Sequence, residues 1–136
     1  MDKARAAYDE LYVYTMTRPG FILQHVVDAF CVQTAPEDGP PIGVVFGLVG
    51  LFLRVERQFS GRQIQEVHKK LGRAKRQLPR IDFPKNRGRM SALDVLSASA
   101  GIERDKAIDN WCRSVWISFS HNRQAIISLL ADYRIT

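Results

Sequence analysis

His25 and Asp28 stand three residues apart in a segment, 21–33, whose apolar content favours a helix. At about 100° per residue, Gln24, Asp28 and His25 fall at about 0°, 40° and 100° around the helix axis, so they share one side. A histidine and a carboxylate so placed can form an acid-base pair, in which the carboxylate fixes the imidazole tautomer, or can supply two ligands to one metal ion. The alternative is that this polar arc is the solvent-facing side of an amphipathic helix.

Two further polar residues are candidates for the same site. Glu56 continues an apolar helical track and is expected at the end of the core. A buried carboxylate is seldom unpaired, so an ion pair with Arg54 or Arg57 is the structural alternative for it. His121 stands where a helix bends or restarts, so capping and packing are the alternatives to a chemical role there.

The joint hypothesis is a polar site between the second, third and sixth helices of the chain. Its chemistry is assigned to His25, Asp28, Glu56 and His121. His25 would carry the proton, and Asp28 would orient the imidazole. Two histidines and two carboxylates also suit Zn, Mn or Fe in a helical bundle, but the repeated Glu-x-x-His motif of such centres is missing, so metal and cofactor content stay open. Gln33, Trp111 and Trp116 are assigned to ligand binding, although tryptophan at helical spacing is typical of a core.

The elements that must position these residues are all helical. Apolar residues at helical spacing predict helices over 2–17, 21–33, 41–59, about sixteen residues from 60, 91 to about 101, 103–119 and 125–133. Ser60 and Ser91 have the side chain expected of a helix N-cap. No segment alternates with period two for long enough to indicate a sheet. We therefore expect an all-α protein, a single-domain bundle of five to seven helices over residues 1–136.

Three glycines, Gly43, Gly47 and Gly50, interrupt the most apolar run of the chain, residues 42–53. Each costs roughly 1 kcal/mol relative to alanine if it is helical, so something should offset the cost. Close approach of a neighbouring backbone is one explanation, and room for a bound ligand is the other. As a helix the run would span about 18 Å, well short of a hydrocarbon core of about 30 Å, which argues against a membrane span.

The charge is unevenly distributed. Twelve of the 20 Lys and Arg residues fall between Arg54 and Arg89, against three acidic residues, so this segment carries about nine net positive charges. The exposed face of the fourth helix is expected to carry Arg62, Lys69, Arg73 and Arg76. Such a face could bind nucleic acid or an acidic protein with salt-dependent affinity. The alternative is a solvated face, which is favoured over nucleic acid because there is no tight helix-turn-helix connection and no interleaved aromatic residue.

The remaining composition indicates an intracellular domain. Cys31 and Cys112 are isolated within apolar helical patterns, which is typical of buried free thiols and not of a metal-binding spacing. The first ten residues lack the apolar stretch of a secretory signal. We expect a cytoplasmic protein with no membrane partner. The oligomeric state stays open, with a homo-oligomer through the glycine-bearing helix as one option.

Several short motifs follow one another along the chain. They are Leu23-Gln-His-Val-Val-Asp-Ala-Phe30 with Gln33, Leu53-Arg-Val-Glu-Arg57, Val67-His68 and Trp111-Cys-Arg-Ser-Val-Trp-Ile-Ser-Phe-Ser-His121. In this order they resemble an uncharacterised bacterial family, domain of unknown function 5946, over roughly residues 8 to 130. The family block is similar to "H-x-x-V-D-A-Y-x-x-Q-H-P", but here Thr34 follows Gln33, so one family histidine is missing. A cysteine-rich N-terminal turn is also absent.

The resemblance implies positions that should be tested together and supplies no activity. Our leading expectation is a small-molecule-binding or enzymatic domain with the polar site described above. The alternative is a binding module for an anionic partner, nucleic acid or acidic protein, through the basic segment 54–90.

Overall fold

A computed structural model describes residues 2–73 and 77–135 of the chain, and every regular element within them is helical. The helices are α1 (Lys3–Met16), α2 (Leu23–Thr34), α3 (Pro41–Arg57), α4 (Gly61–Arg73), α5 (Ala92–Ser97), α6 (Ile102–Ser118) and α7 (Arg123–Asp132), with 3-10 turns η1 (Pro19–Phe21) and η2 (Ser120–Asn122). The expected all-α bundle is confirmed, with seven α-helices in this part of the chain. Arg76, which was assigned to the basic face, lies outside the described residues.

Local signals in the sequence set the helix boundaries. The Asp2 carboxylate accepts a hydrogen bond from the Ala4 amide at 3.0 Å and so caps α1. Gly20, at φ +82°, turns the chain between α1 and α2 in the left-handed region that glycine adopts most easily. Before α4, the Ser60 hydroxyl accepts from the Gln63 amide at 3.2 Å, and the Gln63 side chain accepts from the Ser60 amide at 2.8 Å. This reciprocal pair is a capping box.

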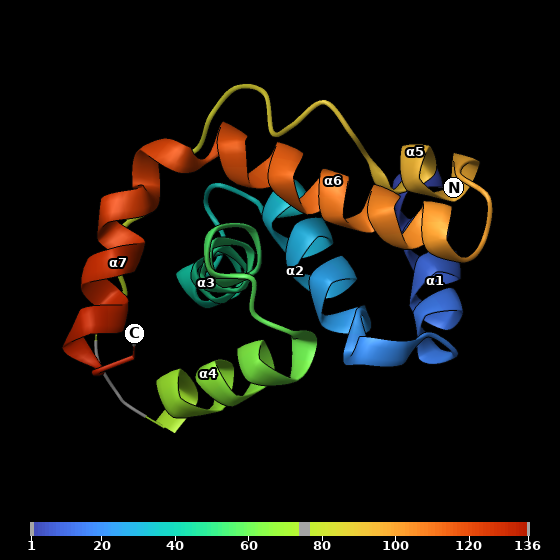
Figure 1. Cartoon of the computed structure of the whole chain (residues 1–136). Coiled ribbons are helices and arrows are strands. Elements are labelled where there is room, and N and C mark those ends of the chain that lie inside the picture. The colour runs from blue at the N-terminus through green and yellow to red at the C-terminus, as the bar shows by residue number, and fades with distance from the viewer. Residues whose placement is uncertain (1, 74–76, 136) are drawn as a thin grey trace.

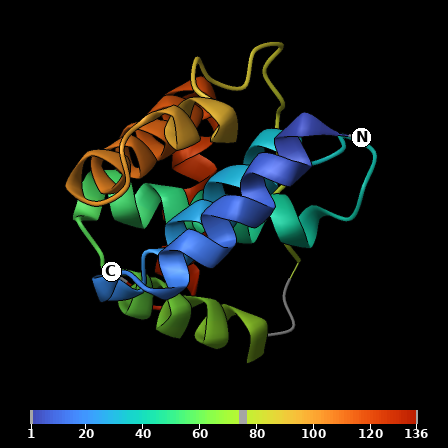
Figure 2. The same cartoon turned by 90° about the vertical axis from the view of Figure 1, so that its right-hand side faces the viewer.

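α2 and α3 lie at the centre of the bundle. α2 packs against α1, α3, α4 and α6, and α3 packs in addition against α4, α6 and α7. In Figure 1, α3 is seen almost end-on, with α6 crossing above it and α4 below. Figure 2 gives the view from the side of α1, which runs along α2. A helix covered on several sides cannot show a simple two-faced pattern, and α2 is such a helix.

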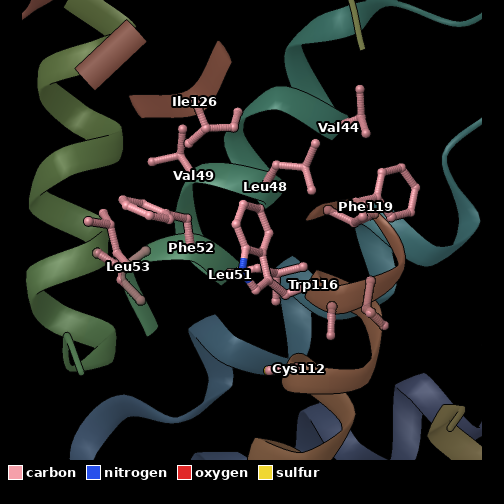
Figure 3. Packing of buried hydrophobic residues seen from close by; sticks show 14 of the residues in the cluster. Val44, Leu48, Val49, Leu51, Phe52, Leu53, Cys112, Trp116, Phe119 and Ile126 are labelled. Carbon is pink, nitrogen blue, oxygen red and sulfur yellow. The ribbon is translucent and has the colours of Figure 1, made fainter. Parts of the chain in front are cut away.

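The hydrophobic core is built around α3. Figure 3 shows the Trp116 indole of α6 directed toward Leu51 and Phe52 of α3, with Ile126 of α7 near Val49. The rings of Phe52 and Trp116 lie with centroids 5.7 Å apart. All five of these side chains are buried. Although α3 is the most apolar helix, no helix in the described part of the chain is both long enough and apolar enough to cross a bilayer.

The glycines of α3 let α2 approach closely. A Cβ atom built on Gly47 would lie 2.6 Å from Val32 Cγ2 and 3.2 Å from the Asp28 carbonyl oxygen of α2. One built on Gly50 would overlap the Asp28 carboxylate. Real Cβ contacts are not so short, so these positions accept only glycine at this helix separation. Close approach of the α2 backbone therefore accounts in part for Gly47, whereas at Gly50 the Asp28 side chain occupies the space. At Gly43 a Cβ atom would make only an ordinary contact with Cys31 Sγ, at 3.4 Å.

The N-terminal helix is tied to a distant part of the chain. The Tyr14 hydroxyl lies 2.7 Å from Asp105 Oδ1 and accepts from the Gly101 amide at 2.9 Å. Arg18 Nη2 donates to Asp105 Oδ2 at 2.7 Å. These contacts fix the end of α1 against the start of α6, and α5 packs against both helices.

Candidate functional site

His25 and Asp28 lie inside the protein, at 2% and 3% exposure. They occupy the side of α2 that meets α3 and α6. Gly50 of α3 stands against the Asp28 carboxyl group, and Cys112 Sγ of α6 lies 3.5 Å from the His25 carbonyl oxygen. The interpretation of this arc as the solvent-facing side of α2 is therefore wrong for both residues. Burial between three helices is where the sequence analysis expected a polar site.

The hydrogen bonds of this pair are incomplete. Asp28 Oδ1 accepts from Gln24 Nε2 at 3.0 Å. Asp28 Oδ2 and His25 Nδ1 are both buried without a hydrogen-bond partner among the described residues. An unpaired buried polar atom typically costs about 1–3 kcal/mol. The expected hydrogen-bonded acid-base pair between these two atoms is thus not formed.

Burial favours the neutral form of both groups. The pKa of the His25 imidazole is lowered to about 4, chiefly by burial and secondly by the nearby Arg54 guanidinium, while Asp109 opposes the change. Burial raises the pKa of the Asp28 carboxyl well above its ordinary value, and the hydrogen bond from Gln24 opposes this only in part. The two pKa values move in opposite directions because desolvation penalises the charged form of each group. At neutral pH His25 is accordingly uncharged, and burial shifts the titration of Asp28 toward its protonated form.

An ion pair joins α3 to α6 next to this site. Arg54 and Asp109 form a bidentate ion pair, in which Arg54 Nε donates to Asp109 Oδ1 and Arg54 Nη2 donates to Asp109 Oδ2, both at 3.0 Å. Arg54 Nη1 also donates to the Phe59 carbonyl oxygen at 3.2 Å. Arg54 had been considered a partner for Glu56, but the structure engages it with Asp109. The pair is only half-buried, so these two charged side chains lie between the buried His25–Asp28 pair and solvent.

Gln33 and Trp111 are hydrogen-bonded to each other, and Gln33 also bonds the backbone of the segment before α5. Gln33 Oε1 accepts from Trp111 Nε1 at 3.0 Å. Gln33 Nε2 donates to the carbonyl oxygens of Arg87 at 3.2 Å and Met90 at 2.6 Å. Every polar atom of the Gln33 side chain is therefore engaged within the protein, and Trp111 is fully buried.

Glu56 and Trp116 meet at the far end of α3. Glu56 Oε2 accepts from Trp116 Nε1 at 2.8 Å, and Arg123 Nε lies 2.9 Å from Glu56 Oε1. The hydrogen bond from Arg123 is the largest influence holding the Glu56 pKa below its ordinary value. The ion pair foreseen for Glu56 is present, but its partner comes from α7 and is neither Arg54 nor Arg57.

His121 anchors the chain that leads out of α4. Its Nε2 atom lies 2.7 Å from the Asp82 carbonyl oxygen, a distance that requires the proton on Nε2. Beside it, Asn122 accepts from the Asp82 amide at 2.9 Å and donates to the same carbonyl oxygen at 2.9 Å. The expected helix bend at this point is confirmed as η2.

The four residues assigned to chemistry therefore occupy three places. His25 and Asp28 share one, Glu56 pairs with α7, and His121 holds Asp82. Within residues 2–73 and 77–135, no group of three or more His, Cys, Asp or Glu side chains is arranged to hold a metal ion. The structure thus keeps the α2 pair as the centre of the candidate site and separates the other two from it.

The family assignment follows from a comparison over most of the chain. The family model described as "Family of unknown function (DUF5946)" matches residues 5–120. The chain belongs to the DUF5946 family. Searches of curated proteins and of solved structures found no match. Where the DUF5946 block is expected to hold a histidine, this member has Thr34, whose hydroxyl donates to the Phe30 carbonyl oxygen at 2.7 Å on an exposed surface.

The basic segment of this DUF5946 member divides into structural and exposed residues. Arg54 belongs to the ion pair described above, and Arg87 donates to the carbonyl oxygens of Gln33 and Ala35. On α4 the expected amphipathic pattern is confirmed, with Ile64, Val67 and Leu71 buried against the bundle. Its opposite face exposes Arg62, Lys69 and Arg73. Arg62 lies over the Phe21 ring at 4.9 Å, and Lys69 pairs with Glu66 at 3.2 Å.

Sequence reasoning did not assign three residues to the candidate site beside His25 and Asp28: Gly50, Arg54 and Asp109. One signal could have found two of them. Gly50 and Arg54 are one helical turn apart and so lie on the same side of the helix. The row of glycines on that side is therefore followed by a charged residue. Asp109 precedes Cys112 by three residues and so shares its face of α6. Only the packing of α6 on α3 shows that these faces meet.

Proposed function

We propose that this domain binds a small polar molecule between α2, α3 and α6, with His25 and Asp28 as its contacts. The observation that supports this most directly is that His25 Nδ1 and Asp28 Oδ2 are buried without a partner in the described chain. A helix used only for packing would avoid the cost of two such atoms by carrying apolar residues there. A ligand that hydrogen-bonds to both atoms would recover that cost.

The protonation states define the chemistry of the proposed ligand. Asp28 Oδ1 already accepts from Gln24, so in the neutral acid the proton is best placed on Oδ2, as a donor. Neutral His25 with its proton on Nε2 offers Nδ1 as an acceptor. A neutral amide or alcohol, which can both accept and donate, is complementary to this pair.

If the site is catalytic, the pKa directions favour Asp28 as the proton carrier. Its pKa is displaced upward from the acid range, whereas His25, with a pKa of about 4, is a weak base at neutral pH. This exchanges the roles that the sequence suggested for the two residues. Because both side chains are closed off from solvent, we assign the entry to the half-buried Arg54–Asp109 pair, whose separation would open α3 from α6.

Native mass spectrometry of gently purified protein tests this proposal. The wild-type protein should carry extra mass beyond its polypeptide, and the variants His25→Ala and Asp28→Asn should lose it while keeping their helical circular dichroism. His68→Ala is the matched control, because His68 is a half-buried histidine bonded to the Phe46 carbonyl oxygen at 2.8 Å, away from the site. A bare polypeptide mass for the wild type, or the same adduct in all three variants, would refute the proposal.

The exposed face of α4 supports a second candidate function, binding of an anionic partner. Arg62, Lys69 and Arg73 are exposed, and only Lys69 has an acidic partner among the described residues. Changing Lys69 and Arg73 to Glu should reduce binding of a single-stranded oligonucleotide or an acidic peptide at least tenfold in fluorescence anisotropy. Binding to the wild type should also weaken steeply with salt. Affinity that does not change with salt would exclude this function.

A further inference from the structure

Residues 77–91, which lead into α5, form a wall over α6 that is fixed by hydrogen bonds. Figure 1 shows it passing above α6. Ser114 Oγ of α6 accepts from the amides of Arg89 at 2.7 Å and Met90 at 3.3 Å. On α2, Gln33 Nε2 donates to the carbonyl oxygens of Arg87 and Met90. The backbone of residues 87–90 is thus bonded to two helices.

Gly88 lets this wall lie close to α6. Its φ of +113° is in the region that favours glycine, and a Cβ atom there would lie 3.0 Å from Ser114 Oγ. Between the wall and α6 is a pocket of about 580 Å³. Pockets for small ligands typically measure about 300–1,000 Å³. The space is therefore of the right size for a small molecule.

The lining of this pocket combines positive charge with apolar surface. Arg89 contributes from the wall and Arg113 from α6, and both are exposed. Neither guanidinium has a hydrogen-bond or ion-pair partner among the described residues, and the lining contains no acidic side chain. Met90 and Ile117, the latter 62% exposed, supply apolar surface. Two unpaired arginines beside exposed apolar side chains are complementary to an anion that has an apolar tail.

We infer that this pocket, here called the α6 pocket, binds a small amphipathic anion. Arg89 and Arg113 hold the anionic head, and Met90 and Ile117 contact the apolar tail. The α6 pocket uses none of the residues of the His25–Asp28 site, so this inference stands or falls independently of the proposed function.

Titration calorimetry with octanoate and with octyl phosphate tests this inference, and octan-1-ol is the uncharged control. At least one anion should bind the wild type, and octanol should bind at least tenfold more weakly. The variants Arg89→Gln and Arg113→Gln should each weaken anion binding about tenfold, and Ile117→Ser should weaken it severalfold. Lys106→Gln is the matched control, since it removes one positive charge from an exposed position of α6 that does not line the pocket.

The two anions also distinguish the kind of head group that the pocket prefers. Tighter binding of octanoate would indicate a carboxylate, and tighter binding of octyl phosphate would indicate a phosphate. Three results would overturn the inference. They are no heat of binding for either anion, equal binding of octanol, or equal binding of the anion by wild type and the Arg89→Gln/Arg113→Gln double variant. Both arginines are on the surface, so these variants are expected to fold normally.

Discussion

Replacing Gly50 with alanine should destabilise the domain by about 2–3 kcal/mol, the upper part of the range of about 1–3 kcal/mol typical of overpacking in a core. The new methyl group would overlap the Asp28 carboxylate, which is itself enclosed and has a short side chain. Relief requires α2 and α3 to move apart along the rest of their contact, including the tight contact at Gly47. Urea denaturation followed by circular dichroism measures the change in the free energy of unfolding.

Gly72→Ala is the matched control for that prediction. Gly72 lies in α4 with no atom close to where its Cβ would be, so alanine there should stabilise the helix by up to about 1 kcal/mol. The opposite signs of the two changes separate packing from helix propensity. Combining Gly50→Ala with Asp28→Ala should recover part of the loss, because the methyl group then has space. A Gly50→Ala variant as stable as wild type would mean that Asp28 is not held against α3.

The second large effect is a loss of stability on acidification that depends on His25. The folded-state pKa of about 4 lies below the ordinary value of 6.5, so the unfolded state takes up the proton first. The contribution of His25 is therefore fully present above pH 6.5 and is lost as the pH falls through about 4. The difference between these pKa values corresponds to about 3 kcal/mol. In urea denaturation from pH 8 to pH 4, the free energy of unfolding of the wild type should fall by about that amount more than the free energy of unfolding of His25→Gln.

Asp28 acts in the opposite sense, which provides the control. Its raised pKa means that its contribution to stability is present below its unfolded pKa and is lost as the pH rises through the folded one. Lowering the pH therefore removes the free-energy cost of a buried charge at Asp28, while it adds the cost of keeping His25 unprotonated in the folded state. The Asp28→Asn variant removes the relief, so it should lose stability more steeply than wild type as the pH falls. Parallel pH profiles for wild type and His25→Gln would contradict the buried, neutral assignment of His25.

Much of the fold was predictable because its signals are local. Proline and glycine at positions 19 and 20 end the first helical segment, Pro41 begins α3, and Ser60 caps α4 through Gln63. The buried stripe of α4 was also predictable, because only one side of that helix contacts the bundle. Each of these features depends on residues within a turn or two of one another.

The candidate site was only partly predictable, because its contacts join distant segments. The spacing of His25 and Asp28 places them on one side of α2, but their burial depends on α3 and α6 covering that side. Glu56 pairs with Arg123, 67 residues away, although nearer arginines were available. His121 bonds Asp82 across 39 residues. Helical periodicity shows which residues share a face, but it does not show which faces meet.

The tie between Tyr14 and the start of α6 also bears on the order in which the chain can complete its fold. Tyr14 bonds Gly101 and Asp105, 87 and 91 residues later. During synthesis, α1, α2 and α3 are therefore made well before the partners that fix α1 exist. Contacts of such long separation must wait for loop closure, which slows folding. The side of α1 that packs against α5 stays uncovered until that last third of the protein has been made, an interval in which a chaperone could bind it.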